Sequence, residues 1–358
     1  MQNLILDTNI YYKDIKRKTA AFQALESLIR KSLIKLYVPY FVEREFISQL
    51  TSLYEKSYEE IIHNLAQLCK INYLNEESYK KLEKAYFDKN KILKQAKLHY
   101  LNWLYDMKAE KCDLTLNNYK NTFEDYFEGK PPFKNIKSRK DIPDGLIFQN
   151  IKQICEKEKE VHFISEDKDF LAACKRSSSD LHIYCSLDDF IKSDVCKGYI
   201  DLDESEQALI LDYCVNNLSE LTSRIAAVAP SFLAWKKITS TKILDDNNEG
   251  TIVCSGEPND VSYGFSEADY YGGGIIVVPC SFETNIEVSY YLYKADYYAM
   301  DKILSVSEHS DHYYSVEENF QASIEALVRF EFDIQMDGVV GVNFKNCGID
   351  SLVQIEIL

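Results

Sequence analysis

Four acidic residues stand at positions where a folded chain can gather them. Asp7 and Asp167 each follow a short apolar run that predicts a β-strand, and Glu45 and Asp144 lie near the start of predicted helices. In a parallel α/β sheet, ligands bind at the carboxyl ends of the strands, near the point where the strand order reverses. We therefore expect the four carboxylates to converge in one crevice.

Carboxylates that converge repel one another unless cations lie between them. Mg²⁺ and Mn²⁺ prefer hard oxygen ligands, and one or two such ions activate water and stabilise the leaving oxygen in phosphodiester cleavage. Each acid alone also has a structural explanation: Asp7 and Asp167 as helix N-caps, Glu45 as a solvent-facing residue, and Asp144 as a first-turn acid favoured by the helix dipole. Their combination favours the metal site.

The elements that must position these acids alternate between strand and helix in residues 1–200. Strand-like apolar runs are found at residues 4–6, 36–38, 161–164 and 181–185. Spacings of three and four between apolar residues predict helices around them, and residues 52–130 look helical throughout. This alternation predicts an α/β fold with a parallel sheet covered on both faces.

The pattern changes near residue 200, where we place the boundary between domains 1–200 and 201–358. One helix is predicted over Glu206–Leu221. Beyond it, apolar residues alternate with others around residues 286–292, 324–334 and 353–357. This period of two, with Gly272-Gly-Gly and Asp337-Gly as turn signals, predicts a smaller, antiparallel, β-rich domain.

The net charge of −16 is distributed unequally between the two parts. Residues 201–358 hold 8 Lys and Arg against 27 Asp and Glu, and residues 1–200 hold the other 33 against 30. Phosphate binding needs only local positive potential, so an acidic whole does not exclude nucleic acid as a partner of the first domain. For the acidic second domain we expect a protein partner, or an inhibitory role that imitates the charge of nucleic acid.

The ten cysteines stand singly and form no CxxC pair, which is typical of reduced thiols in a cytoplasmic protein. No run of 18 apolar residues predicts a membrane span, and the N-terminus lacks the basic and apolar regions of a signal peptide. We expect a cytoplasmic protein without a membrane partner.

Four short motifs, taken in order over about residues 1–195, resemble those of PIN-domain nucleases. They are Leu-Ile-Leu-Asp7-Thr8-Asn9, Val-Pro-x₂-Val-x₂-Glu45-Phe, Pro-Asp144-Gly-Leu-Ile and Phe-Ile-Ser165-x-Asp167-Lys-Asp169-Phe. The resemblance implies a three-layer α/β/α domain that hydrolyses single-stranded RNA, or sometimes DNA, with Mg²⁺ or Mn²⁺, leaving a 5′-phosphate and a 3′-hydroxyl. Homo-oligomers are common in the family. The helical stretch at 52–130 is closer to larger bacterial members with an appended domain.

This resemblance also implies roles for individual residues. The metal-site acids are Asp7, Glu45, Asp144 and Asp167. Residues expected to orient these ligands or a water are Thr8, Asn9 and Ser165, and Asp169 is expected to act as an auxiliary acid.

The helical insertion leaves two of these positions open. Glu43 is an alternative to Glu45, which is preferred because it follows Val42 by three residues and precedes an apolar residue. Asp141 is a second candidate, either in place of Asp144 or beside it. Asp144 is preferred because it directly precedes Gly-Leu-Ile.

Basic residues must hold a nucleic-acid strand near the acids. Those just upstream of Asp144 are Lys134, Lys137, Arg139 and Lys140, and we expect them to contact phosphates. The Lys-rich segment 80–97 has two interpretations, a solvated helix face or a second phosphate-binding arm.

The sequence thus predicts a divalent-metal-dependent nuclease that acts on single-stranded RNA or DNA. The rival from another class is a non-catalytic PIN-like module that binds nucleic acid or protein within a larger complex. A domain of that kind loses acids, whereas all four are present here. Two further hypotheses are a structure-specific DNA nuclease with the insertion as a clamp, and the toxic effector of a toxin–antitoxin or phage-defence system that a signal releases.

Overall fold

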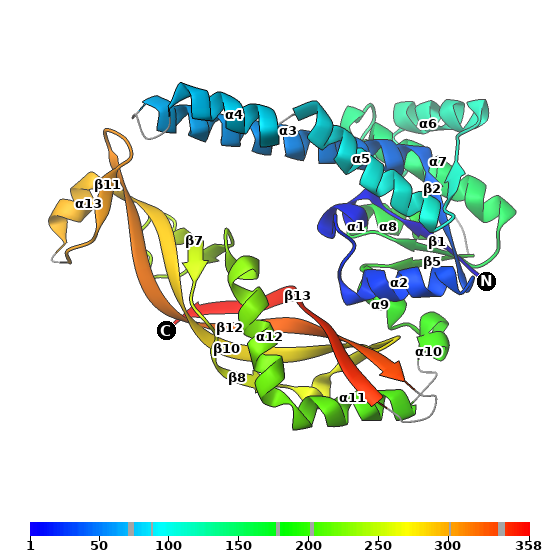
Figure 1. The fold of residues 1–358 in the computed structure, drawn as a ribbon. Helices are drawn as coiled ribbons and strands as arrows, with labels where there is room; N and C mark the ends of the chain where they lie inside the picture. The colour runs from blue at the N-terminus through cyan, green and yellow to red at the C-terminus, as the bar shows by residue number, and fades with distance from the viewer. Residues whose placement is uncertain (71–74, 87–88, 177–179, 201–203, 301, 336–340) are drawn as a thin grey trace. The chain divides into compact units, whose positions relative to one another are not determined.

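The computed structural model describes two compact units, each presented here by itself (Figure 1). The first comprises Met1–Arg17 and Ala21–Cys196, and the second comprises Lys18–Ala20 and Lys197–Leu358. The described residues are all those outside 71–74, 87–88, 177–179, 201–203, 301 and 336–340.

The first unit is built on a five-stranded parallel sheet in the order β3-β2-β1-β4-β5. Its strands are β1 (Gln2–Leu6), β2 (Ile34–Pro39), β3 (Glu110–Cys112), β4 (Val161–Ile164) and β5 (Leu181–Tyr184). Every residue of β4 is buried, as expected for a parallel strand covered on both faces. The register pairs Leu6 with Ile164, so the central strands β1 and β4 end side by side.

Helices cover both faces of this sheet, which confirms the three-layer α/β/α prediction. In Figure 1, α2 and α9 lie on one face and α3 and α7 on the other. The helices are α1 (Thr8–Lys13), α2 (Ala20–Arg30), α3 (Tyr40–Lys70), α4 (Glu76–Tyr86), α5 (Lys89–Asp106), α6 (Leu116–Glu128), α7 (Ile142–Lys157), α8 (Lys168–Lys175), α9 (Leu187–Ile191) and α10 (Asp194–Ile200), with a 3-10 turn η1 at Arg139–Asp141.

One strand of this sheet was not predicted. β3 lies inside the stretch expected to be wholly helical and forms the edge of the sheet next to β2. Its three residues, Glu110, Lys111 and Cys112, are exposed or half-buried, so they show no apolar run. Pairing with β2, not local sequence, makes this segment a strand.

The long helix α3 begins where β2 ends and packs against α4 and α5. Only Val42, Phe46 and Leu50 are buried along it, all in its first third. The start of α3 therefore belongs to the core of the first unit, whereas the rest of α3 extends away from that core with α4 (Figure 1).

An aromatic cluster attaches these helices to the core. The rings of Phe46 and Tyr100 lie 4.5 Å apart between centroids, and Tyr11 lies 5.7 Å from Phe46 and 6.0 Å from Trp103. The guanidinium of buried Arg17 lies 5.0 Å from the Trp103 ring, a cation–π distance. Residues from α1, α3 and α5 are thus fixed to one another directly beside Glu45.

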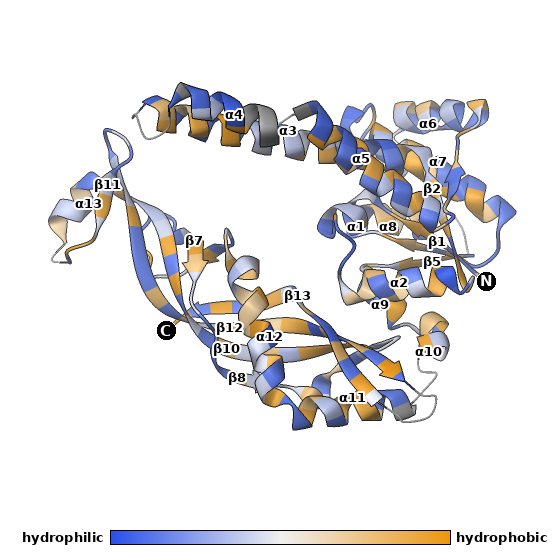
Figure 2. Ribbon diagram, in the orientation of Figure 1, coloured by the Kyte–Doolittle hydropathy of each residue, from blue (hydrophilic) through white to orange (hydrophobic). Residues whose placement is uncertain are grey.

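The second unit is an eight-stranded, antiparallel sheet, which confirms the predicted β-rich domain. Its strands are β6 (Lys237–Thr239), β7 (Glu249–Ser255), β8 (Asn259–Tyr263), β9 (Asp269–Gly272), β10 (Ile275–Tyr293), β11 (Val306–Glu308), β12 (Tyr313–Gln335) and β13 (Gly341–Ile357). Figure 2 shows hydrophobic and hydrophilic residues alternating along the long strands. On β10 the even-numbered residues from Ile276 to Leu292 are all buried, as the period of two predicts.

The helices of the second unit differ from the prediction. The expected single helix over Glu206–Leu221 is wrong in its extent, because this stretch is divided between two helices, α11 (Glu204–Asn216) and α12 (Leu218–Leu233). A further helix, α13 (Lys294–Ala299), follows later in the unit. The buried residues Leu221, Ile225, Ala229 and Leu233 place α12 against the sheet core. Gly273 and Gly274 form the predicted turn between β9 and β10, and the Asp337-Gly signal falls outside the described residues.

In the part of the chain that the structure describes, no helix combines the length and the hydropathy of a membrane span. None of the ten cysteines forms a disulfide.

Phe46→Ala is expected to lower the free energy of unfolding of the first unit by about 3–5 kcal/mol, because it removes a fully buried ring and leaves a cavity. The matched control is Phe127→Ala, whose ring is 57% exposed and whose loss should cost less than about 1 kcal/mol. Urea unfolding followed by circular dichroism measures both. Equal losses in the two variants would contradict the role of the cluster.

Candidate active site

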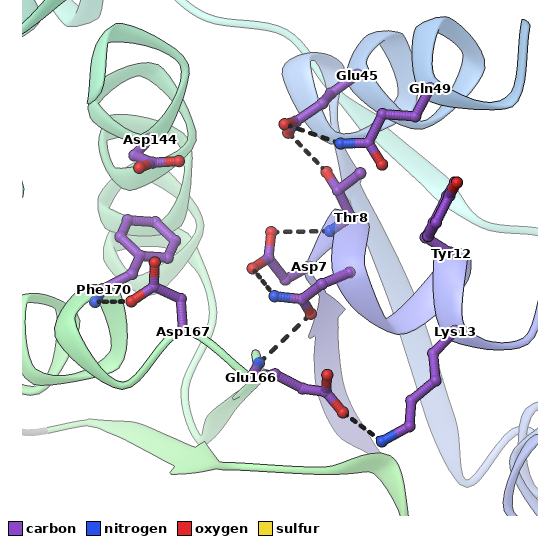
Figure 3. Close-up of a pocket in the computed structure, with 11 residues that line it drawn as sticks. Asp7, Thr8, Tyr12, Lys13, Glu45, Gln49, Asp144, Glu166, Asp167 and Phe170 are labelled. Atoms are coloured by element: carbon purple, nitrogen blue, oxygen red, sulfur yellow. Dashed lines mark hydrogen bonds and ion pairs between the residues drawn. The ribbon is translucent and has the colours of Figure 1, made fainter. Parts of the chain in front are cut away.

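A pocket of about 430 Å³ opens at the carboxyl ends of β1 and β4 (Figure 3). The backbone N–H of Asp7 donates to the carbonyl of Ile164 at 2.9 Å, which holds the two strand ends together. The pocket is lined by Asp7, Thr8, Asn9, Tyr12, Lys13, Glu45, Gln49, Asp144, Glu166, Asp167 and Phe170. All four acids predicted from the sequence therefore face one cavity.

Asp7 lies at the bottom of the pocket and is only 7% exposed. Its Oδ1 accepts the backbone N–H of Thr8 at 2.8 Å, so it caps α1 as its structural explanation requires. Its Oδ2 accepts the Ser165 hydroxyl at 2.5 Å and the Asn9 amide at 2.9 Å. These donors hold the carboxylate in one orientation and favour its ionised form.

Ser165 and Asn9 connect the two strand ends behind the acids. The Asn9 amide donates to the Ser165 Oγ at 3.2 Å, and the same oxygen accepts the backbone N–H of Asp167 at 3.1 Å. Ser165 is fully buried, whereas Asn9 lines the pocket. Both residues thus position acids, as the family resemblance implies.

Glu45 reaches the pocket from α3. Buried Val42 and Phe46 fix the rotation of this helix, and Glu45 lies between their face and solvent. Its Oε2 accepts the Thr8 hydroxyl at 2.8 Å, and its Oε1 accepts the Gln49 amide at 3.3 Å. The alternative acid, Glu43, instead forms an ion pair with Lys111 at 2.8 Å and does not line the pocket.

Asp144 lies in the first turn of α7, with Pro143 beside it at the helix start. A Cβ on the next residue, Gly145, would approach the Phe133 ring to 2.6 Å and the Thr122 methyl to 3.0 Å. Glycine is therefore needed here for α7 to pack closely enough to present Asp144. No described residue donates a hydrogen bond to the Asp144 carboxylate, which leaves its oxygens open to the pocket.

Asp167 is the exposed member of the four acids. Its Oδ1 accepts the backbone N–H groups of Asp169 and Phe170, both at 2.9 Å, and so caps α8. Figure 3 shows its side chain on the same wall as Asp144. The N-cap and the pocket position coexist, so the structural explanation does not exclude a functional one.

The acids influence one another electrostatically. The pKa of Asp144 is raised to about 7, mainly by burial and in smaller part by repulsion from Asp7, Glu45 and Asp167. The pKa of Asp7 is raised to about 6, mainly by burial; the hydrogen bonds from Ser165 and Thr8 oppose this rise, and the charges of Glu45 and Asp167 contribute to it. Two carboxyls that titrate near neutral pH in one crevice are a mark of a functional site.

The remaining predicted residues lie outside the pocket lining. Asp169 is exposed and pairs with Lys134 at 2.7 Å, which lowers the pKa of Asp169. Asp141 accepts the backbone N–H of Lys134 at 3.1 Å, and its charge contributes to the raised pKa of Asp144. Lys137, Arg139 and Lys140 are exposed on the same loop, ahead of α7. A contact of these basic residues with phosphate stays a prediction.

Sequence reasoning missed five residues that line the pocket around the acids: Tyr12, Lys13, Gln49, Glu166 and Phe170. The signal for three of them was helical spacing. Gln49 follows Glu45 by four residues, as Tyr12 and Lys13 follow Thr8 and Asn9, and residues four apart share a helix face.

The donor set matches a hard divalent cation. The pocket offers carboxylate, hydroxyl and amide oxygens and no cysteine or histidine, which suits Mg²⁺ or Mn²⁺ and not a soft metal. The open carboxylate of Asp144, facing three other acids, is the group that most needs a cation. Among the described residues no three His, Cys, Asp or Glu side chains stand close enough to ligate one ion together. An ion here would retain several waters, as Mg²⁺ commonly does.

The fold and the site define the first unit as a parallel α/β domain with four acids around one pocket at the ends of β1 and β4. Within this class of domain, residues 4–170 match the family model of the PIN domain, so this part of the chain is a PIN domain. PIN domains are generally nucleases and typically bind Mg²⁺ or Mn²⁺. No curated protein and no solved structure matches the chain.

The raised pKa values predict how stability depends on pH when metal is removed. Both carboxyls have an ordinary pKa of 3.8, against about 6 and 7 in the folded protein. The folded state therefore binds more protons, and this contribution is complete below about pH 4 and lost as the pH rises through 6 and 7. In chelator, the melting temperature should fall between pH 5 and 8.

Asp144→Asn should flatten this fall, and Mn²⁺ should raise the melting temperature more at pH 8 than at pH 5. Each kcal/mol corresponds to about 2–4 °C for a unit of this size. Asp169→Asn is the matched control, because the pKa of Asp169 is lowered and lies below the window. A melting temperature that is independent of both pH and Mn²⁺ would refute the coupled acid site.

Proposed function

We propose that the PIN domain of this chain is a metal-dependent nuclease that hydrolyses phosphodiester bonds of single-stranded RNA or DNA. The observation that supports it is the convergence of Asp7, Glu45, Asp144 and Asp167 on one pocket at the ends of β1 and β4. N-capping explains Asp7 and Asp167, and the helix dipole explains Asp144, one residue at a time, but none of these roles requires the acids to converge on one pocket.

The four acids would hold one or two Mg²⁺ or Mn²⁺ ions. When bound, such an ion supplies positive charge to the phosphate oxygens and lowers the pKa of water. Ser165, Asn9 and Thr8 keep Asp7 and Glu45 oriented toward the ion before substrate arrives, which avoids reorganisation during the reaction. With a pKa of about 7, Asp144 is also able to take up a proton near neutral pH when the ion is absent.

Nucleic acid is assigned to the first unit because of the charge distribution. The second unit belongs to the stretch with 8 basic and 27 acidic residues, which repels phosphate. Its acidity supports a protein partner or inhibitor there. The toxin or phage-defence role and the cytoplasmic location stay hypotheses, and the location is supported by ten cysteines of which none forms a disulfide.

Asp7→Asn and Asp144→Asn are each expected to reduce cleavage of labelled single-stranded RNA and DNA by at least about 100-fold. The reason is that a lost ion removes several kcal/mol of transition-state stabilisation, and about 1.4 kcal/mol corresponds to tenfold in rate. Gel analysis in Mn²⁺, with and without chelator, measures the rate. Asp106→Asn, at an exposed acid outside the pocket lining, is the control that should keep activity. A wild-type chain that binds but does not cut either nucleic acid would favour the non-catalytic binding module.

Thr8→Val should lower activity by about 10–100-fold and raise the Mn²⁺ concentration needed for half-maximal rate. Valine has the shape of threonine but cannot donate to Glu45, so that carboxylate loses its 2.8 Å hydrogen bond. Thr8→Ser keeps the hydroxyl and should retain most activity. If Thr8→Val has the wild-type metal dependence, Glu45 does not depend on Thr8.

A further inference from the structure

The wall of the pocket opposite Asp144 and Asp167 is formed by α1 (Figure 3). Thr8 and Asn9 begin this helix, and Tyr12 and Lys13 follow each by four residues, so the two pairs form adjacent stripes along the pocket. The first pair holds the acids Asp7 and Glu45. The second pair is exposed to solvent, and it makes no hydrogen bond or ion pair with any of the four acids of the predicted metal site.

Tyr12 has an aromatic side chain that takes no part in packing the core. Its side chain is 40% exposed and lines the pocket, whereas its neighbour Tyr11 is fully buried in the aromatic cluster. Within the described part of the chain, the Tyr12 ring stacks on no other ring and its hydroxyl makes no hydrogen bond. An exposed ring at the edge of a phosphodiester site is the feature that single-strand-binding proteins use to stack bases.

Lys13 is the cation of this wall. Its Nζ lies 2.5 Å from a carboxylate oxygen of Glu166, and the two side chains are 68% and 41% exposed. An exposed pair of this kind contributes little to stability, so another anion displaces its partner easily. Of the described residues that line the pocket, Lys13 alone is positively charged. A phosphate that enters among five carboxylates has no other lining cation of the protein to meet.

We propose that Tyr12 and Lys13 form the strand-binding wall of the pocket and select an unpaired nucleotide. Tyr12 stacks on the base, and Lys13 leaves Glu166 for a phosphate of the same strand. The cavity of about 430 Å³ lies in the range that encloses one small ligand, so it admits one nucleotide. A base inside a duplex is stacked on its neighbours and cannot present its face to Tyr12. This inference rests on the proposed nuclease function and names its substrate form.

The test measures binding separately from cleavage. The full chain carrying Asp144→Asn is the common background, and fluorescence anisotropy follows labelled oligouridine, oligothymidine and a duplex of equal length. Tyr12→Ala should weaken single-strand binding by about 5- to 100-fold, because stacking on one base is lost, while Tyr12→Phe keeps the ring and the affinity. Tyr40→Ala is the matched control: its ring is 42% exposed and lies outside the pocket.

The ion pair gives two changes of opposite sign. Lys13→Ala should weaken binding and reduce the salt dependence by about one phosphate contact. Glu166→Gln should tighten binding, because Lys13 is then free for phosphate. Lys16→Ala removes an exposed lysine three residues away, outside the pocket, and should leave the affinity unchanged.

The inference is overturned if Tyr12→Ala binds like the background, if Glu166→Gln does not bind more tightly, or if the duplex binds as well as the single strands. Cleavage by the wild type in Mn²⁺ distinguishes a failure of this inference from a failure of the proposed function. If the wild type cleaves, and Tyr12→Ala changes neither the affinity nor KM, the strand-binding role of Tyr12 is refuted and the nuclease function is retained. If the binding changes occur as expected but the wild type cleaves nothing, the strand-binding role of Tyr12 and Lys13 is supported and the nuclease function is refuted.

Discussion

The first unit must hold together several carboxylates that repel one another in one crevice, and its other features depend on this constraint. Asp7 is almost fully buried, Asp144 is half-buried, and the charges of neighbouring acids raise the pKa of both carboxyls. Hydrogen bonds from Ser165, Asn9 and the Thr8 backbone fix Asp7, so its position does not relax away from the other acids. These hydrogen bonds orient Asp7 but do not neutralise the negative charge of the acids, and a divalent cation would neutralise it.

The sheet and helices act as supports for this arrangement. The register of β1 and β4 sets Asp7 beside Ser165, and the burial of Val42 and Phe46 turns Glu45 inward. The absence of a side chain at Gly145 lets α7 approach closely enough to present Asp144. Carboxylates held on strand ends and helices keep their geometry better than carboxylates on loops, which is what a site with mutually repelling groups requires.

Of the described residues that line the pocket, none comes from the insertion at 52–130 or from the second unit. The aromatic cluster around Tyr11 and Phe46 anchors α3 and α5 at the site end only, and the remainder of α3 has no buried residue. The second unit has its own core, formed by the inward residues of its sheet with α11 and α12. The acidity of the second unit opposes the binding of phosphate groups there.

The sequence by itself determined which residues are available and the class of fold. Asp7 and Asp167 were identifiable because each follows an apolar run, and period and spacing are local properties that reflect burial directly. The period of two likewise predicted the long strands β10 and β12. These features depend only on residues that are close along the chain, so they can be identified from the sequence alone.

Only the tertiary structure decided between near neighbours. Glu43 and Glu45 are two residues apart on one helix, and packing of α3 directs one to Lys111 and the other to Thr8. Tyr11 and Tyr12 are adjacent, yet one is in the core and the other faces the pocket. The strand β3 exists through its pairing with β2, and its three residues show no pattern of their own. In each case the deciding contact is with a residue distant in sequence, which local spacing does not encode.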